Sequence, residues 1–146
     1  EAKVEGVETS LVWTPLDLLE VGTTFTKNHT KVLKNDEDPE TEDENMTDVP
    51  ENVWNLFATL RTQYITWNVG ATRIGRIYTD NEGVQDPDIY GGYSRKMLVD
   101  TRIAFTPDEQ WELALSVSNL LDEDDVYMGS SVAPEREFFL ELGYTF

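Results

Sequence analysis

The sequence predicts an all-β fold, an antiparallel transmembrane β-barrel segment of about seven up-and-down strands. Three observations support this prediction. Stretches of the 146-residue chain alternate apolar and polar side chains, so that one face meets hydrocarbon or a core and the other meets water. Short and long connections alternate between these stretches. The last stretch runs to an aromatic residue, Phe146, and an aromatic end is typical of the terminal strand of bacterial outer-membrane barrels.

The first half of the chain is expected to form two pairs of strands, each joined by a short turn. Residues 7–13 and 19–26 make the first pair, joined at Pro15, which presets φ for a turn and lacks a donor for the ladder. Residues 54–61 and 67–72 make the second pair, with a turn near Thr62 and Gln63. A long acidic connection, from about residue 31 to residue 50, separates the two pairs.

The second half is expected to add three strands, at residues 99–105, 111–118 and 138–146. The turn at residues 106–109 is short and contains Pro107. Two further long loops are expected, one at residues 78–95, which is rich in Asp, Gly and Tyr, and one at residues 122–134.

The sorting of the connections indicates how the strands are oriented. If Phe146 lies at the periplasmic end, the three short turns lie there too and the long loops face outward, as in bacterial outer-membrane barrels. Trp13, Trp67 and Trp111 then lie close to periplasmic turns, where an aromatic girdle is expected. A small barrel of about eight strands with its first strand missing, or a secreted β-sandwich, remains an alternative.

The polar face of the strands would line the barrel lumen. Seven charged residues are expected to share that face: Glu8, Glu20, Arg61, Asp100, Arg102, Glu112 and Glu141. No nucleophile or set of metal ligands accompanies them, so an enzyme is not expected.

Several motifs resemble those of TonB-dependent outer-membrane receptors of the siderophore-receptor type. The Ser-Asn-Leu-Leu-Asp run at residues 118–122, the Pro-Glu-Arg at 134–136 and the closing Tyr-Thr-Phe resemble the end of such a receptor. Residues 48–57 and 70–78 resemble earlier strands of the family. Two positions depart from the family pattern, Arg73 and Leu121, where aromatic residues are usual; both are interpreted as packing sites.

The resemblance implies that residues 1–146 are the C-terminal part of a larger barrel of about 22 strands with a plugged lumen. The plug domain and the TonB box would lie outside this sequence. It further implies uptake of an iron–siderophore or a similar scarce ligand, driven by the inner-membrane proton gradient. The implied partners are outer-membrane lipid, the remaining strands and plug of the same receptor, TonB, and the barrel-assembly machinery. Five residues of the last strand are expected to form the assembly signal: Phe138, Leu140, Leu142, Tyr144 and Phe146.

The amino-acid composition argues against several kinds of binding site and partner. The chain has no Cys and a single His, which argues against disulfides and against a Cys- or His-rich metal site, and no cofactor is expected. A net charge of −18 makes nucleic acid an improbable partner, because neutralising phosphates needs clustered Lys and Arg. Seven strands cannot close a bacterial barrel, so the first and last strands are expected to pair with strands outside residues 1–146.

The most unusual local composition in the chain is the acidic run at residues 35–44. Asp36, Asp38 and Glu42 are candidate calcium ligands, although the run lacks a central Gly and EF-hand spacing. The alternatives are an electrostatic funnel for a cationic ligand and a solvated loop that repels itself. His29 and Tyr78, near the outer ends of their strands, are candidate ligand contacts or ordinary rim residues.

Overall fold

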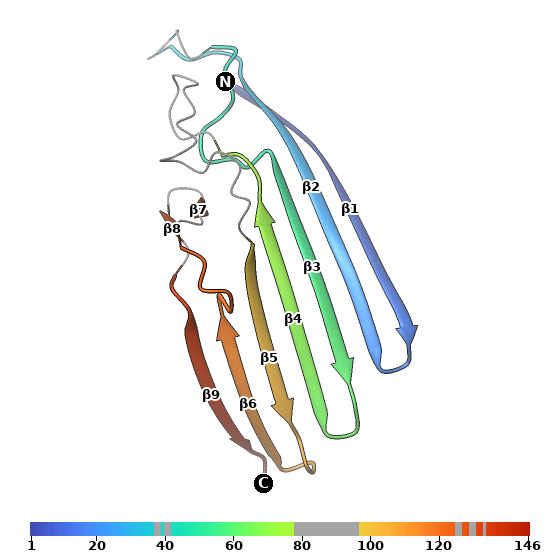
Figure 1. The fold of residues 1–146 in the computed structure, drawn as a ribbon. Helices are drawn as coiled ribbons and strands as arrows, with labels where there is room; N and C mark the ends of the chain where they lie inside the picture. Colours follow the sequence, from blue (N-terminus) through green and yellow to red (C-terminus); the bar gives the residue numbers. More distant parts are fainter. Residues whose placement is uncertain (37–38, 40–41, 78–96, 125–126, 129–130, 133) are drawn as a thin grey trace.

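The structure is a computed structural model and describes residues 1–36, 39, 42–77, 97–124, 127–128, 131–132 and 134–146. One seven-stranded antiparallel sheet dominates it, with strand order β1-β2-β3-β4-β5-β6-β9, and a two-stranded hairpin, β7-β8, stands apart (Figure 1). Within the described ranges, no helix has the length and apolarity needed to cross a membrane.

The strands have these bounds: β1 (Ala2–Leu16), β2 (Leu19–Val32), β3 (Asn52–Arg61), β4 (Ile65–Ile74), β5 (Leu98–Phe105), β6 (Trp111–Ser118), β7 (Tyr127–Met128), β8 (Ser131–Val132) and β9 (Glu137–Tyr144). All seven expected strands are therefore confirmed, and each pairs antiparallel with its neighbours in the sheet. The tight turns and the C-terminus lie at one end of the sheet, whereas the N-terminus lies at the other (Figure 1).

The first two strands are longer than the sequence pattern predicted. β1 begins at Ala2 and β2 continues to Val32, with Ala2 opposite Val32, so β2 runs to about the residue where the acidic connection was expected to begin. In the outer half of β2 both faces carry polar residues, and in the outer half of β1 the charged residues Lys3 and Glu5 lie on the face that is apolar further along. Neither half shows the alternation of the inner halves. Backbone pairing does not need that alternation, because every residue offers its N–H and C=O groups whatever its side chain.

The two expected elements nearest the C-terminus were also wrong in detail. β9 ends at Tyr144, and Phe146 lies beyond the strand. The Thr145 amide still donates to the Gln110 carbonyl at 2.8 Å, so backbone contact with the preceding turn persists to that residue. The loop expected at residues 122–134 contains the hairpin β7-β8, whose strands of 2 residues each are too short to show a period. The loop expected at residues 78–95 lies outside the described residues.

The sheet is open and single-layered. β1 and β9 form its two edges and do not pair with each other. Among the described residues the only buried hydrophobic side chains are Ile77, Ala104, Ala114 and Val117. A β-sandwich buries a continuous apolar layer between two packed sheets, so the sandwich alternative is wrong.

Candidate functional site: the two faces of the sheet

The polar face of the sheet is linked by hydrogen bonds that run across strands. The Asn55 amide on β3 donates to the Thr24 hydroxyl on β2 at 3.0 Å and accepts from the Thr72 hydroxyl on β4 at 2.9 Å. Two rows nearer the short turns, the buried Thr59 hydroxyl donates to the Asn68 amide oxygen at 3.0 Å. These side chains satisfy one another across the strands, which keeps this face ordered and hydrophilic.

Arg102 forms the charged centre of the same face. Its guanidinium donates to Glu112 on β6 and to Glu141 on β9, both at 2.9 Å, and thus links three consecutive strands. Ala104 and Ala114, directly opposite each other on this face, are almost fully buried. The strand register places all seven charged residues expected in the lumen on this one face. The predicted polar face is confirmed as a geometric feature.

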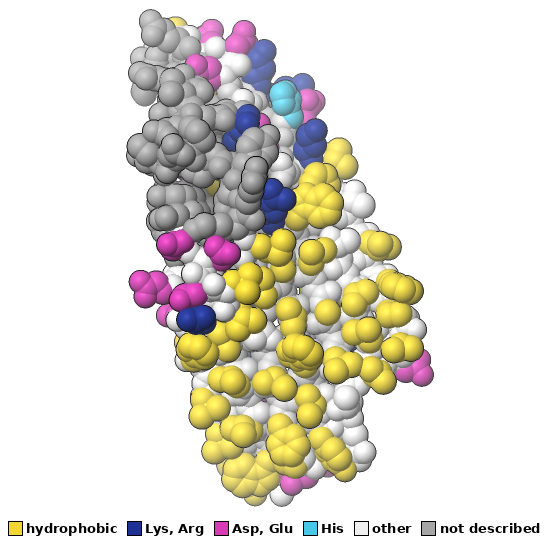
Figure 2. All heavy atoms as spheres, in the orientation of Figure 1, with side chains coloured by type: hydrophobic (Ala, Val, Ile, Leu, Met, Phe, Trp, Pro, Cys, Tyr) yellow, Lys and Arg dark blue, Asp and Glu magenta, His cyan; other side chains and the backbone are white. Residues whose placement is uncertain are grey.

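The opposite face is a broad apolar surface (Figure 2). Leu11, Leu140 and Leu142 are among its side chains, with 63%, 75% and 70% of their area exposed in the protein alone. A sheet with this much contiguous exposed apolar area is stable only against hydrocarbon or another apolar surface. The alternation of this face with the polar face is the pattern of a lipid-facing barrel wall.

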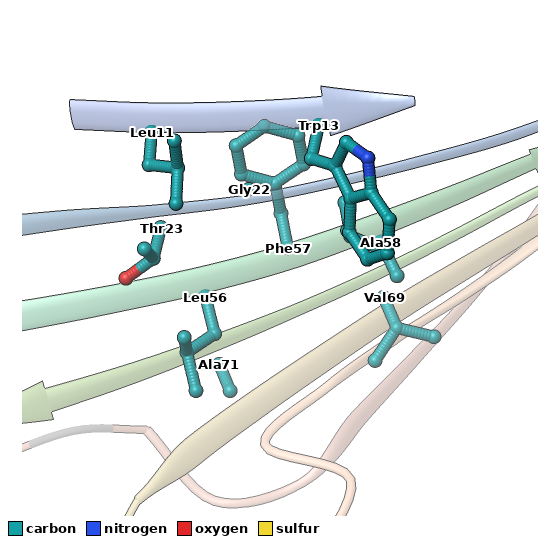
Figure 3. A pocket seen from close by; sticks show the side chains of 10 residues that line it. Leu11, Trp13, Gly22, Thr23, Leu56, Phe57, Ala58, Val69 and Ala71 are labelled. Carbon is teal, nitrogen blue, oxygen red and sulfur yellow. The ribbon is translucent and has the colours of Figure 1, made fainter. Parts of the chain in front are cut away.

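A shallow groove of about 380 Å³ crosses the apolar face near the β1–β2 turn (Figure 3). Leu11 and Trp13 from β1 border it, and small side chains such as Ala58 and Ala71 leave its floor open. The lining offers almost no polar atoms beyond the Thr23 hydroxyl, so the groove has the chemistry of a surface covered by acyl chains rather than of a catalytic pocket.

Aromatic rings gather at the end of the sheet with the short turns. The Trp111 and Tyr144 rings lie 4.6 Å apart, and Tyr144 lies 6.0 Å from the Phe146 ring. Phe146 thus lies beside Tyr144 even though it is outside β9. Trp67 is at the same end, where its indole N–H donates to the Thr101 hydroxyl at 2.8 Å. Interfacial aromatics of this kind mark the boundary of a bilayer.

A cluster at the other end of β6 fastens the last loop. Asn119 is 2% exposed and has a left-handed φ of 48°, and its amide donates to the carbonyls of Glu123 and Pro134 at 2.8 and 3.0 Å. Asp122, also left-handed, accepts from the Arg136 guanidinium at 3.0 Å. The two end motifs found in the sequence therefore bind each other. The sequence alone does not predict this contact, although Asn and Asp adopt a left-handed φ more often than most other non-glycine residues.

The candidate ligand and calcium residues are scattered or lie outside the described part. His29 is exposed on β2 opposite Glu5, on the outward side, and Tyr78 is outside the described residues. Asp36 pairs with Lys34, Glu42 accepts from the Asn35 amide at 3.3 Å, and Asp38 is not described.

Among the residues that the structure describes, no group of three or more His, Cys, Asp or Glu side chains could hold a metal ion. Both the ligand and the calcium assignments stay predictions.

These faces, ends and turns define a segment of a bacterial outer-membrane β-barrel. The model of the family "TonB dependent receptor-like, beta-barrel" matches residues 1–120, and the chain belongs to this family. The family is one of receptors rather than enzymes, and its members reside in the outer membrane of Gram-negative bacteria. A comparison with curated proteins gives no match.

Solved structures with a similar fold include the siderophore receptor PiuA from Acinetobacter baumannii, at 18% identity and a TM-score of 0.75. The ferric-catecholate import receptor Fiu from E. coli has 21% identity and a TM-score of 0.73. A mutant of the ferric enterobactin receptor PfeA from Pseudomonas aeruginosa has 18% identity and a TM-score of 0.71. The alignments cover 98%, 99% and 98% of this chain but only 22%, 21% and 22% of those chains. The chain thus spans about a fifth of the length of these receptors.

Proposed function

We propose that the chain forms part of the barrel of a TonB-dependent transporter that takes up an iron–siderophore or a similar scarce ligand across the outer membrane. The observation that carries the proposal is the family match over residues 1–120. The similar solved structures named as siderophore or ferric-catecholate receptors support the ligand class.

In this proposal the polar face lines the lumen and contacts a plug domain supplied by sequence outside residues 1–146. The Arg102 network and the Asn55 ladder suit that role, because they are held in place by hydrogen bonds before any plug contact forms. TonB would act on the plug, and the barrel-assembly machinery would read the last strand. The edge strands β1 and β9 would pair with further strands, since unpaired backbone groups in hydrocarbon cost several kcal/mol each.

The test is uptake of ⁵⁵Fe-loaded siderophores by cells expressing the complete receptor in a background without other iron receptors. We expect accumulation that stops when TonB is deleted or when a protonophore collapses the proton gradient. Uptake that continues under both treatments would identify a passive barrel instead, which is the outcome expected of a small outer-membrane barrel. A panel of catecholate, hydroxamate and citrate complexes assigns the ligand.

A further inference from the structure

Lys and Arg side chains gather on the face of the sheet that carries the apolar surface. They lie at the end away from the short turns, just beyond the edge of that surface. The chain has 11 Lys and Arg against 29 Asp and Glu, so chance favours acidic surfaces. The register nevertheless places four cations on the outward side at this end: Lys3, Lys27, Lys31 and Arg73. In Figure 2, Lys and Arg side chains border the hydrophobic surface at the end away from the short turns.

Two of these four cations form ion pairs with neighbours, and the other two form none with any residue that the structure describes. Lys3 pairs with Glu5 and Lys31 with Asp43, each at 2.8 Å. Lys27 and Arg73 are exposed, and within the described part of the chain neither has an ion pair or hydrogen bond from its side chain. No described side chain therefore neutralises either charge.

Lys27 and Arg73 flank a pair of aromatic rings. Arg73 lies opposite Trp54 in the β3–β4 ladder, and Trp54 lies opposite Phe25 in the β2–β3 ladder, with the two rings 4.7 Å apart. Lys27 lies two residues after Phe25 in β2, on the same face of the sheet. Two strand spacings and two residues along the strand separate the Lys27 and Arg73 Cα atoms by about 12 Å. Long cationic side chains at a membrane interface extend their heads toward the polar layer, so both can approach one headgroup above the rings.

An apolar hollow lies next to Arg73 on the apolar face of the sheet. Its volume is about 210 Å³, and Trp54, Leu56, Ala71, Arg73 and Met97 line it. The small Ala71 side chain leaves room beside Leu56, and Arg73 is the only charged residue among the described residues of the lining. A cation at the outer rim of an apolar hollow complements an amphiphile with an anionic head.

We propose that Lys27, Arg73 and this hollow, together the Lys27–Arg73 surface, bind one phosphorylated lipid of the outer leaflet. The phosphate lies between the ammonium of Lys27 and the guanidinium of Arg73, and an acyl chain lies in the hollow over Ala71. Guanidinium and ammonium groups both bind phosphate, the guanidinium through paired N–H donors. This surface faces lipid, away from the lumen, so it does not depend on which ligand the receptor transports.

The test measures lipid retention by the complete receptor, purified in detergent and analysed by native mass spectrometry. The probes are lipid A and its dephosphorylated form. We expect Lys27→Gln and Arg73→Gln each to lower retention of lipid A about fivefold, the effect of about 1 kcal/mol for each cation near an anionic surface. Retention of the dephosphorylated form should not change. Arg61→Gln, which removes a cation from the polar face at the opposite end, is the matched control and should leave retention unchanged.

Ala71→Leu tests the hollow separately, because it adds apolar volume on a lipid-facing position and leaves both cations in place. It should lower retention of both lipid forms. Heat-modifiability on gels confirms that each variant is a folded barrel. Equal retention of the two lipid forms by the wild type, or equal losses in Arg61→Gln and Arg73→Gln, would overturn the phosphate site. Unchanged retention in Ala71→Leu would overturn the acyl-chain position.

Discussion

Gly22 and Gly70 offer a sharp test of the polar face, because they flank the same ring in one row of the sheet. Gly22 on β2 and Gly70 on β4 both lie opposite Phe57 on β3. A Cβ built on Gly22 would lie 2.4 Å from two ring carbons of Phe57 and 3.0 Å from the Leu11 carbonyl oxygen. A Cβ on Gly70 would meet nothing within 4 Å. The Phe57 ring therefore leans across Gly22 and away from Gly70.

The two alanine substitutions should consequently differ in sign. Gly22→Ala overpacks the row and should destabilise the barrel by about 1–3 kcal/mol. Gly70→Ala meets open space and restricts the unfolded chain, so it should be neutral or stabilising by about 0.4–1 kcal/mol. The difference between the variants should be about 1–4 kcal/mol.

The assay is urea unfolding of the complete receptor in detergent, followed by tryptophan fluorescence and checked by heat-modifiability. Phe57→Leu in the Gly22→Ala background should recover part of the loss, with a coupling energy of about 1 kcal/mol or more in the double-mutant cycle. Equal stabilities of Gly22→Ala and Gly70→Ala, or additive effects of Gly22→Ala and Phe57→Leu, would refute the packing of Phe57 over Gly22.

Three further predictions concern the outward face, the last loop and the terminus. Leu56→Arg or Leu115→Arg should cost about 2–4 kcal/mol in a lipid folding assay, whereas Thr72→Arg or Ser116→Arg on the polar face should cost much less; equal costs on both faces would contradict the barrel orientation. Asp122→Asn keeps a residue that tolerates the left-handed φ but removes the carboxylate, so it should weaken the contact with Arg136 by about 0.2–1 kcal/mol. Proteolytic cleavage between residues 123 and 134 should become faster. An unchanged cleavage rate would show that this ion pair does not hold the loop. Deleting Phe146 should lower the outer-membrane abundance of the complete receptor far more than the heat resistance of barrels already assembled, because one interfacial aromatic contributes at most roughly 1.5–3 kcal/mol of burial; unchanged abundance would remove the assembly-signal hypothesis.

The strands that cross hydrocarbon could be predicted from the sequence because lipid on one side and water on the other impose a period of two. The β3, β5 and β6 bounds lie within two residues of the prediction for that reason. The outer halves of β1 and β2 were missed because water borders both faces there, so Lys27 and His29 can follow Phe25 on the outward side without breaking the ladder. Backbone hydrogen bonds between β1 and β2 continue beyond the residues whose side chains alternate, so both strands are longer than that alternation indicates.

The last loop shows a different limit. Its motifs were visible as Asn119, Asp122 and Arg136, but their mutual contacts join residues 14 to 15 positions apart around a turn with left-handed backbone. Residue types alone do not fix such a geometry, because it depends on where β6 and β9 release the chain. The polar-face charges were easier to predict, since a shared face follows directly from the alternation once the register is known.

Arg73 illustrates how the same residue changes meaning between sequence and structure. The sequence alone shows it as a departure from a position that is usually aromatic, and predicts a packing site. In the structure it is exposed, lies opposite Trp54 and forms the charged rim of an apolar hollow. Packing does not explain an exposed guanidinium at the edge of a lipid-facing surface, whereas an anionic headgroup does. The strands of this chain thus present two chemically distinct walls, a hydrogen-bonded one for the lumen and an apolar one with a cationic margin for the membrane.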